Sequence, residues 1–197
     1  MSRVLGVILA GGQATRMGGG DKGLLDLGGQ TMLARVITRL SPQVDDMVLN
    51  ANGDPARFAA YSLPVVPDSI ADFPGPLAGV LAGMDHAAER SINHVLTVAA
   101  DTPFFPLDLR ARLAEDPATI RLAATREGDR TYRHPTFGLW PTALREDLRQ
   151  ALKDGLRKVV LWTDRHGTGQ VLFPEDAFFN VNTPEDLAEA QRRLEQV

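Results

Sequence analysis

The sequence predicts an α/β fold in which helices cover a mostly parallel sheet. Two segments, residues 4–10 (VLGVILA) and residues 94–100 (HVLTVAA), are almost entirely apolar, as strands are when both faces of a parallel sheet are covered. Strand-like and helix-like segments alternate through the first half of the chain, which is typical of βαβ units. Two strand-like runs joined by Glu127-Gly128-Asp129 then break the alternation. They indicate either a mixed sheet or a small insertion.

The first half is expected to contain four strands and the helices between them. The strands are residues 4–10, 47–51, 64–67 and 94–100. Thr31 is a suitable N-cap for a helix whose apolar side chains recur at helical spacing, and Pro55 after Asp54 predicts the start of a short helix. Gly75-Pro76 precedes another helix, which carries Leu77, Val80, Leu81 and Met84.

The second half is expected to combine the hairpin with further helices. Residues 120–126 and 132–140 form its two strands, and residues 170–173 form a short strand later in the chain. Helices are expected after Pro106 and near residues 143–153 and 157–165, with Gly155 where a helix would stop. Thr183-Pro184-Glu185-Asp186 predicts a last helix, because a cap, a proline and two acidic residues coincide there.

Length and composition narrow the class of protein. A chain of 197 residues is expected to form one domain. It has no cysteine, which excludes disulfides, thiolate metal sites and a cysteine nucleophile, and which fits a reducing cytoplasm. The net charge is −4 and no basic block is present, so a nucleic-acid partner is not expected. No apolar run approaches the roughly 20 residues that span a bilayer.

The sharpest motif follows the first strand. Residues 9–22 (LAGGQATRMGGGDK) combine glycines with two cations, Arg16 and Lys22. Glycines let backbone N–H groups approach an anion closely, and the cations suit a triphosphate. A P-loop is excluded, because Lys22 is preceded by aspartate and followed by glycine. Gly18-x-Gly20-x-x-Gly23 matches the dinucleotide fingerprint but begins well past the strand, and a merely flexible loop is the other alternative.

Polar residues at the ends of later strands are the next candidates. Asp101 is placed either to hold Mg²⁺ or to cap a turn. Asp68 either selects guanine, by accepting hydrogen bonds from its N1–H and exocyclic amine, or caps a turn. Asn182 precedes a helix N-terminus, where it either contributes to an anion or metal site or forms an Asx turn. His134 either faces a substrate or is a satisfied histidine, and the four histidines show no zinc-ligand spacing.

Taken together, these motifs resemble those of the nucleotidyltransferases that act on the molybdenum cofactor. The resemblance starts with Leu-Ala-Gly-Gly, Arg16-Met17-Gly18-Gly19 and Asp21-Lys22. Further stretches resemble the guanylyltransferase branch and follow in the same order along nearly the whole chain: Asn50-Ala51-Asn52, Gly75-Pro76-Leu77-Ala78-Gly79, Asp101-Thr102-Pro103, His134-Pro135 and Asn180-Val181-Asn182-Thr183-Pro184-Glu185-Asp186-Leu187. Gln13-Ala14 departs from the more basic pair of some relatives, so charge there is not essential if the resemblance holds.

The resemblance implies a three-layer α/β/α fold of the nucleotide-diphospho-sugar-transferase type, which is Rossmann-like, over residues 1–197. Residues 1–103 would form a nucleotide-binding half and residues 104–197 an acceptor-binding half. GTP, Mg²⁺ and molybdopterin are the implied ligands, and other cofactor-biosynthesis proteins and molybdoenzyme chaperones are implied partners. The implied nucleotide-binding residues are Leu9, Ala10, Gly11, Gly12, Lys22, Asn50, Asp68 and Asp101. Asp101 would also hold the metal, and His134, Asn180 and Asn182 would lie near the acceptor.

This implies transfer of GMP from GTP to the terminal phosphate of molybdopterin, with release of pyrophosphate. Lys22, Arg16 and Asp101 would be the catalytic residues, since the work is to position two polyanions and neutralise charge. Arg157 and Lys158 either help to hold the acceptor or lie on a solvated helix face. The alternatives are a cytidylyltransferase or sugar-phosphate nucleotidyltransferase of the same fold, and a non-catalytic module that binds nucleotide or cofactor.

Overall fold

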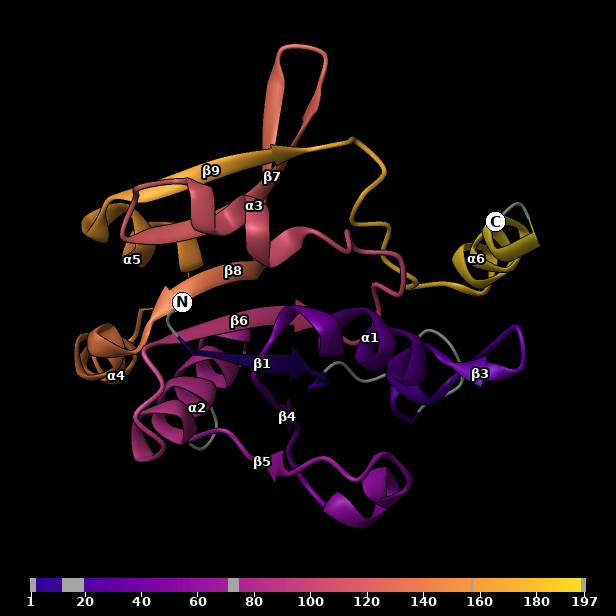
Figure 1. Ribbon diagram of the computed structural model, residues 1–197, viewed down its shortest axis with the longest axis horizontal. Helices are drawn as coiled ribbons and strands as arrows, with labels where there is room; N and C mark the ends of the chain where they lie inside the picture. Colours follow the sequence, from indigo (N-terminus) through magenta and orange to yellow (C-terminus); the bar gives the residue numbers. More distant parts are fainter. Residues whose placement is uncertain (1–2, 12–19, 71–74, 157, 196–197) are drawn as a thin grey trace.

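A single mixed sheet forms the centre of the molecule (Figure 1). The computed structural model describes residues 3–11, 20–70, 75–156 and 158–195. Within them the sheet has seven strands in the order β5-β4-β1-β6-β8-β7-β9. The strands are β1 (Val4–Leu9), β4 (Asp46–Asn50), β5 (Val65–Val66), β6 (His94–Ala99), β7 (Ile120–Glu127), β8 (Arg130–Pro141) and β9 (Thr168–Phe173). Two short strands that the sequence analysis did not anticipate, β2 (Asp26–Leu27) and β3 (Gln30–Thr31), form a separate hairpin.

The direction of β8 makes the sheet mixed. β1 pairs in parallel with β4 and β6, and β4 with β5. β8 runs antiparallel to both β6 and β7, and β9 returns parallel to β7. The mostly parallel sheet with a mixed part is therefore confirmed, and the predicted hairpin belongs to the main sheet. Its tip projects beyond β9 (Figure 1).

Helices cover both faces of the sheet, giving three layers. Along β1, Val4 and Ile8 pack into one apolar cluster with α1 (Met32–Leu40) and α3 (Leu109–Glu115). Leu5 and Val7 point the other way, into a second cluster with α2 (Pro76–Glu89), α4 (Arg145–Lys153) and α5 (Val159–Thr163). Because alternate side chains of a strand face opposite sides, a strand covered by helices on both sides is apolar at every position.

The helix starts follow the expected capping chemistry. Thr31 Oγ1 accepts a hydrogen bond from Ala34 N at 3.1 Å, which begins α1. Asp54 caps the 3-10 helix Pro55–Tyr61 in the same way, with 2.9 Å to Ala56 N. Gly155 has a φ of +87° just after α4 ends. Such local signals are visible in sequence because each depends on residues within one turn.

The last helix, α6 (Pro184–Glu195), lies apart from the sheet and packs beside the β2–β3 hairpin (Figure 1). Thr183 and Asp186 form a reciprocal cap, with Asp186 N donating to Thr183 Oγ1 and Thr183 N donating to Asp186 Oδ2. Just before the cap, Val181 N donates to the carbonyl oxygen of Asp101 at 2.9 Å. The chain is thereby brought back to the end of β6. Among the described helices, none is long and apolar enough to cross a bilayer.

Candidate active site at the carboxyl ends of the strands

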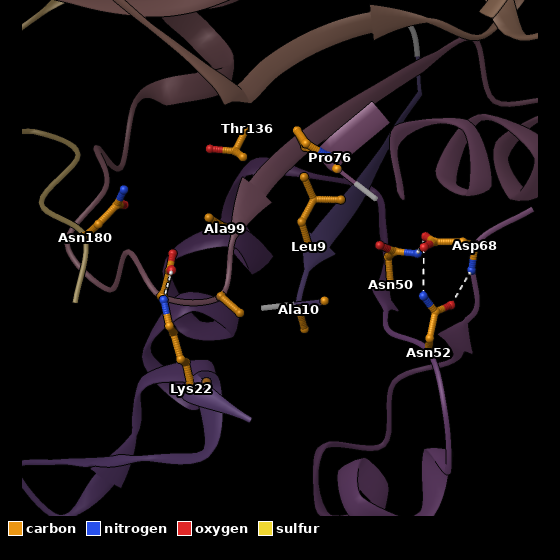
Figure 2. Close-up of a pocket in the computed structure, with 15 residues that line it drawn as sticks. Leu9, Ala10, Lys22, Asn50, Asn52, Asp68, Pro76, Ala99, Thr136 and Asn180 are labelled. Carbon is orange, nitrogen blue, oxygen red and sulfur yellow. Dashed lines mark hydrogen bonds and ion pairs between the residues drawn. The ribbon is translucent and has the colours of Figure 1, made fainter. Parts of the chain in front are cut away.

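A cleft of about 440 Å³ opens at the carboxyl ends of β1, β4 and β6 (Figure 2). Open α/β sheets bind ligands at this edge. Leu9 and Ala10 lie in the middle of the view, between two groups of polar side chains. The described lining residues are Leu9, Ala10, Gly11, Lys22, Gly23, Asn50, Asn52, Asp68, Gly75, Pro76, Ala99, Ala100, Asp101, Thr136 and Asn180.

The first polar group consists of Asn50, Asn52 and Asp68. The buried Asn50 amide donates to the Val66 carbonyl at 3.1 Å and to Asp68 Oδ1 at 3.0 Å. Asn52 bonds to Asp68 twice, donating to Oδ2 at 2.8 Å and accepting from the backbone N–H at 2.9 Å. Both carboxylate oxygens of Asp68 are thus held by amide donors, and each keeps acceptor capacity for a ligand.

The second polar group surrounds Lys22. Its Nζ lies 3.7 Å from Asp101 Oδ2 and donates to Asn182 Oδ1 at 2.5 Å. Burial raises the pKa of the Asp101 carboxyl, and the neighbouring Lys22 ammonium and the Thr102 hydroxyl oppose that rise. The Asp101 carboxylate is only partly buried, with 24% of its side chain exposed, and one ammonium compensates its charge in part, so this end of the cleft favours further positive charge together with phosphate.

Residues from the second half of the chain complete the cleft. Thr136 reaches it from β8, and Asn180 from the segment that follows β9. Thr102 Oγ1 donates to Asn180 Oδ1, which fixes this side chain against the end of β6. In Figure 2, Asn180 and Thr136 lie on the side of the cleft opposite Asp68. Both halves of the chain therefore contribute side chains to the cleft.

Most of the candidate residues from the sequence analysis meet here. Eight of them line the cleft: Leu9, Ala10, Gly11, Lys22, Asn50, Asp68, Asp101 and Asn180. Asn182 is not among the described lining residues, and its Oδ1 accepts a hydrogen bond from Lys22 Nζ. Gly12, Arg16 and Arg157 lie outside the described residues.

His134 is placed differently from the other candidates, because it is not among the described lining residues. Its Nε2 pairs with Thr125 Oγ1 at 2.8 Å, and its ring packs 4.7 Å from that of Phe178. Burial lowers the pKa of His134 below its ordinary value. These contacts match the satisfied histidine that the sequence left as an alternative.

Sequence reasoning missed Asn52 and Thr136 as lining residues. Asn52 stands two positions after Asn50, and that spacing at a strand end was the available signal. Thr136 had none, because its place depends on β8 running antiparallel to β6. The sequence also gave no sign that Gly79 helps to build the cleft, where its position in α2 leaves no room for a side chain. A Cβ there would lie 2.2 Å from Asn50 Oδ1 and 2.7 Å from Leu9 Cδ2.

The cleft fits a metal that is held jointly with phosphate. Among the described residues, no group of three or more His, Asp or Glu side chains is arranged to hold an ion. Asp101 offers one carboxylate in the cleft. Mg²⁺ binds through one or two carboxylates together with substrate phosphates, so the partly buried Asp101 carboxylate would be one ligand and phosphate would supply others.

Comparison with known proteins agrees with this geometry. Residues 6–167 match the family model of the MobA-like NTP transferase domain. A molybdenum cofactor guanylyltransferase from Bradyrhizobium sp. (strain ORS 278) is 54% identical, over 96% of this chain and 92% of that protein. Another from Nitrobacter hamburgensis is 51% identical, over 95% of this chain and 92% of that protein.

Solved structures share the fold. The molybdopterin-guanine dinucleotide biosynthesis protein A of Archaeoglobus fulgidus superposes with a TM-score of 0.74 at 22% identity, covering 98% of this chain and all of that one. CMP:2-keto-3-deoxy-manno-octonic acid synthetase superposes with a TM-score of 0.77 at 13% identity, covering 99% of each chain. The fold is thus that of the nucleotide-diphospho-sugar transferases. By its matched domain and its relatives along nearly the whole chain, this protein belongs to the molybdenum cofactor guanylyltransferase family.

Proposed function

We propose that this protein transfers the GMP group of GTP to the terminal phosphate of molybdopterin. An oxygen of that phosphate forms a bond to the α-phosphorus of GTP. The bond from the α-phosphorus to the bridging oxygen breaks, and pyrophosphate leaves with the electron pair. The product is the guanine dinucleotide form of the cofactor. The observation that carries the proposal is a cleft with the Asp68 carboxylate, held by two amides, at one end and Lys22 beside the partly buried Asp101 carboxylate at the other.

Asp68 is the proposed guanine-selecting residue. Guanine presents two donors, N1–H and the exocyclic amine, to a carboxylate that only accepts. Cytosine presents one donor, its N4 amine, next to the acceptor N3, so it would satisfy one carboxylate oxygen and leave the other facing an acceptor. The two asparagine amides that donate to Asp68 fix the orientation of both carboxylate oxygens. Asp68 therefore supports GTP over CTP.

Lys22 is the proposed ligand of the β- and γ-phosphates, and Arg16, which lies outside the described residues, is proposed to share this role. Leu9, Ala10, Gly11 and Gly12 would line the path of the phosphates. To bind phosphate, Lys22 exchanges part of its contact with Asp101 and Asn182 for contact with the nucleotide. Asp101 would hold Mg²⁺, which when bound neutralises charge on the phosphates and the leaving group. The acceptor phosphate is already ionised, so no protein nucleophile is needed.

Asn180 and Asn182 are the proposed residues on the acceptor side. Asn180 lines the cleft opposite Asp68, and Asn182 contacts Lys22, so both lie where the acceptor phosphate would approach GTP. His134 precedes the lining residue Thr136 by two positions in β8. It would therefore influence the acceptor only indirectly, through the packing of this strand. The chain has no cysteine, which fits a reducing cytoplasm as the proposed location of the reaction. Suppliers of molybdopterin and proteins that receive the product are the proposed protein partners.

The test is a binding titration with GTP, CTP, ATP and UTP in the presence of Mg²⁺, followed by a transfer assay with molybdopterin and α-labelled GTP. Selective GTP binding and label in the dinucleotide are expected. Preference for CTP would indicate a cytidylyltransferase. Selective binding without transfer would indicate a non-catalytic binding module.

A further inference from the structure

Arg57 links two parts of the site without lining the cleft. It lies in the 3-10 helix Pro55–Tyr61, whose start is fixed by the Asp54 cap and by Pro55. Its guanidinium carbon lies 4.5 Å from the centre of the Phe58 ring, and Phe58 is buried. The capped helix start and the Phe58 ring hold the Arg57 side chain in one orientation, in which it points toward Asp21.

One side of the guanidinium contacts the residue before Lys22. Arg57 Nε donates to Asp21 Oδ2 at 2.6 Å, and both side chains are mostly buried. Asp21 itself begins the turn that carries Lys22, since its carbonyl accepts from Leu24 N at 3.0 Å. A short, partly buried, charge-assisted bond is among the stronger polar contacts in proteins. This bond fixes the position of Asp21 relative to the 3-10 helix Pro55–Tyr61.

The other side of the guanidinium contacts the base-selecting segment. Nη2 donates to the Asn52 carbonyl at 2.6 Å, and Nη1 donates to the Asp54 carbonyl. Asn52 in turn holds the carboxylate and the backbone N–H of Asp68. Gly53 lies between these carbonyls with a φ of +83°, and a Cβ there would lie 3.3 Å from Arg57 Nη1. The backbone of residues 52–54 therefore curves around the Arg57 guanidinium and directs two carbonyl oxygens at it.

We infer that Arg57 is a positioning residue for nucleotide binding. It sets the distance between Lys22, which binds the phosphates, and Asp68, which binds the base. The inference rests on the proposed function. GTP gains the most affinity when its base and its phosphates are bound at the same time. Loss of Arg57 should therefore weaken the binding of GTP more than the binding of ligands that contact only one end of the cleft. Lysine replaces it only in part, because its donors all belong to one nitrogen, whereas arginine reaches the three acceptors from three nitrogens of a planar fork.

The experiment measures dissociation constants of GTP, ITP and GMP, with melting temperatures, for the wild type and its variants. ITP lacks the exocyclic amine and GMP lacks the two outer phosphates, so each reports on one end of the site. For Arg57→Gln, we expect GTP binding to weaken about tenfold and ITP and GMP binding by less than about threefold. Arg57→Lys should be intermediate. Arg90→Gln, at an exposed pair with Glu89, is the control and should leave all three unchanged.

Asp21→Asn and the double variant Asp21→Asn/Arg57→Gln complete a cycle. If the two residues act as one link, the double variant binds GTP no more weakly than the weaker single variant. Additive losses would overturn the inference, as would equal losses for all three nucleotides, which a purely structural role would give. If wild type binds GTP selectively and Arg57→Gln is unaffected, the inference alone fails. If wild type shows no preference for GTP, the proposed function fails and the inference with it.

Discussion

At the scale of single residues, the base end of the cleft depends on the acceptor-only chemistry of Asp68. Its two oxygens are held by Asn50 and Asn52, so the carboxylate cannot turn away from a ligand. This is a preorganised arrangement, in which the cost of orienting the group is met when the protein folds. Selectivity for guanine then depends on matching hydrogen-bond donors to fixed acceptors.

Asp68→Asn should therefore weaken GTP binding by about 100-fold, since it replaces one acceptor with a donor facing the guanine amine. Xanthosine triphosphate has an oxo group in place of that amine, so its binding should improve in the same variant. A titration with both nucleotides measures the change of preference. Asp129→Asn, in the exposed hairpin turn, is the control. Unchanged GTP affinity in Asp68→Asn would remove Asp68 from the base site.

The Asp101 carboxylate should matter for turnover more than for GTP binding. Asp101→Asn keeps the shape but removes the charge that would hold Mg²⁺, so kcat should fall by about 100-fold or more. The affinity for GTP measured without metal should change little, because the only effect of the substitution is then to remove the negative charge next to Lys22. Transfer measured over a range of Mg²⁺ concentrations is the check. A variant with the same Mg²⁺ dependence as wild type would contradict the metal role.

At the scale of elements, the close approach of α2 to β1 and β4 positions the cleft floor. Gly79 makes that approach possible, and Gly83 does the same one turn later, where a Cβ would lie 2.5 Å from Val7 Cγ2. Both glycines lie in a helix interior, where glycine usually costs about 1 kcal/mol relative to alanine. Their presence is explained by packing against the strands.

Gly79→Ala should destabilise the protein by about 1–3 kcal/mol, although helix propensity alone predicts a gain. The new methyl group would displace Asn50, so GTP binding should weaken as well. Chemical denaturation and a GTP titration measure the two effects. In the Asn50→Ala background the clash with Oδ1 is absent, and part of the stability cost should disappear. A stabilised Gly79→Ala variant would mean that α2 moves freely away from β4.

At the scale of the whole molecule, partly buried histidines make the free energy of unfolding depend on pH. Burial lowers the pKa of His86, His94 and His134. The unfolded chain takes up protons first as pH falls through about 6.5, so the free energy of unfolding should fall from pH 7 toward pH 5. Asp101 acts in the opposite sense, because its raised pKa makes the folded state the better proton acceptor at lower pH.

Denaturation at several pH values between 7.5 and 5 measures this dependence. His134→Gln preserves a polar partner for Thr125 without a titrating ring, so it should reduce the slope. Asp101→Asn removes the opposing contribution and should steepen it. Equal slopes in wild type and His134→Gln would mean that His134 does not contribute.

Local patterns predicted the seven strands of the main sheet and the helix caps, because each depends on residues close together in the chain, whereas Asn50 and Asn180 were expected in the cleft only from the family resemblance. Val4–Leu9, Thr31 and Asp54 are examples. Pairings across long separations were not predictable in this way. Lys22 and Asn182 are 160 positions apart, and Asp21 and Arg57 are 36 apart. Nor does any local pattern place β8 between β6 and β7, since antiparallel order is set by tertiary packing.

The reversal of β8 has a consequence for how this protein can be re-engineered. Among the described lining residues, only Thr136 and Asn180 come from beyond residue 103, and β8 supplies the first of them. We propose that residues 1–103 choose the nucleotide and residues 104–197 choose what receives it. A chimera that takes residues 104–197 from a relative with another acceptor would then donate the same nucleotide to a new recipient. Such a chimera must keep the hydrogen bonds between its two parts, from Lys22 Nζ to Asn182 Oδ1 and from Val181 N to the Asp101 carbonyl oxygen.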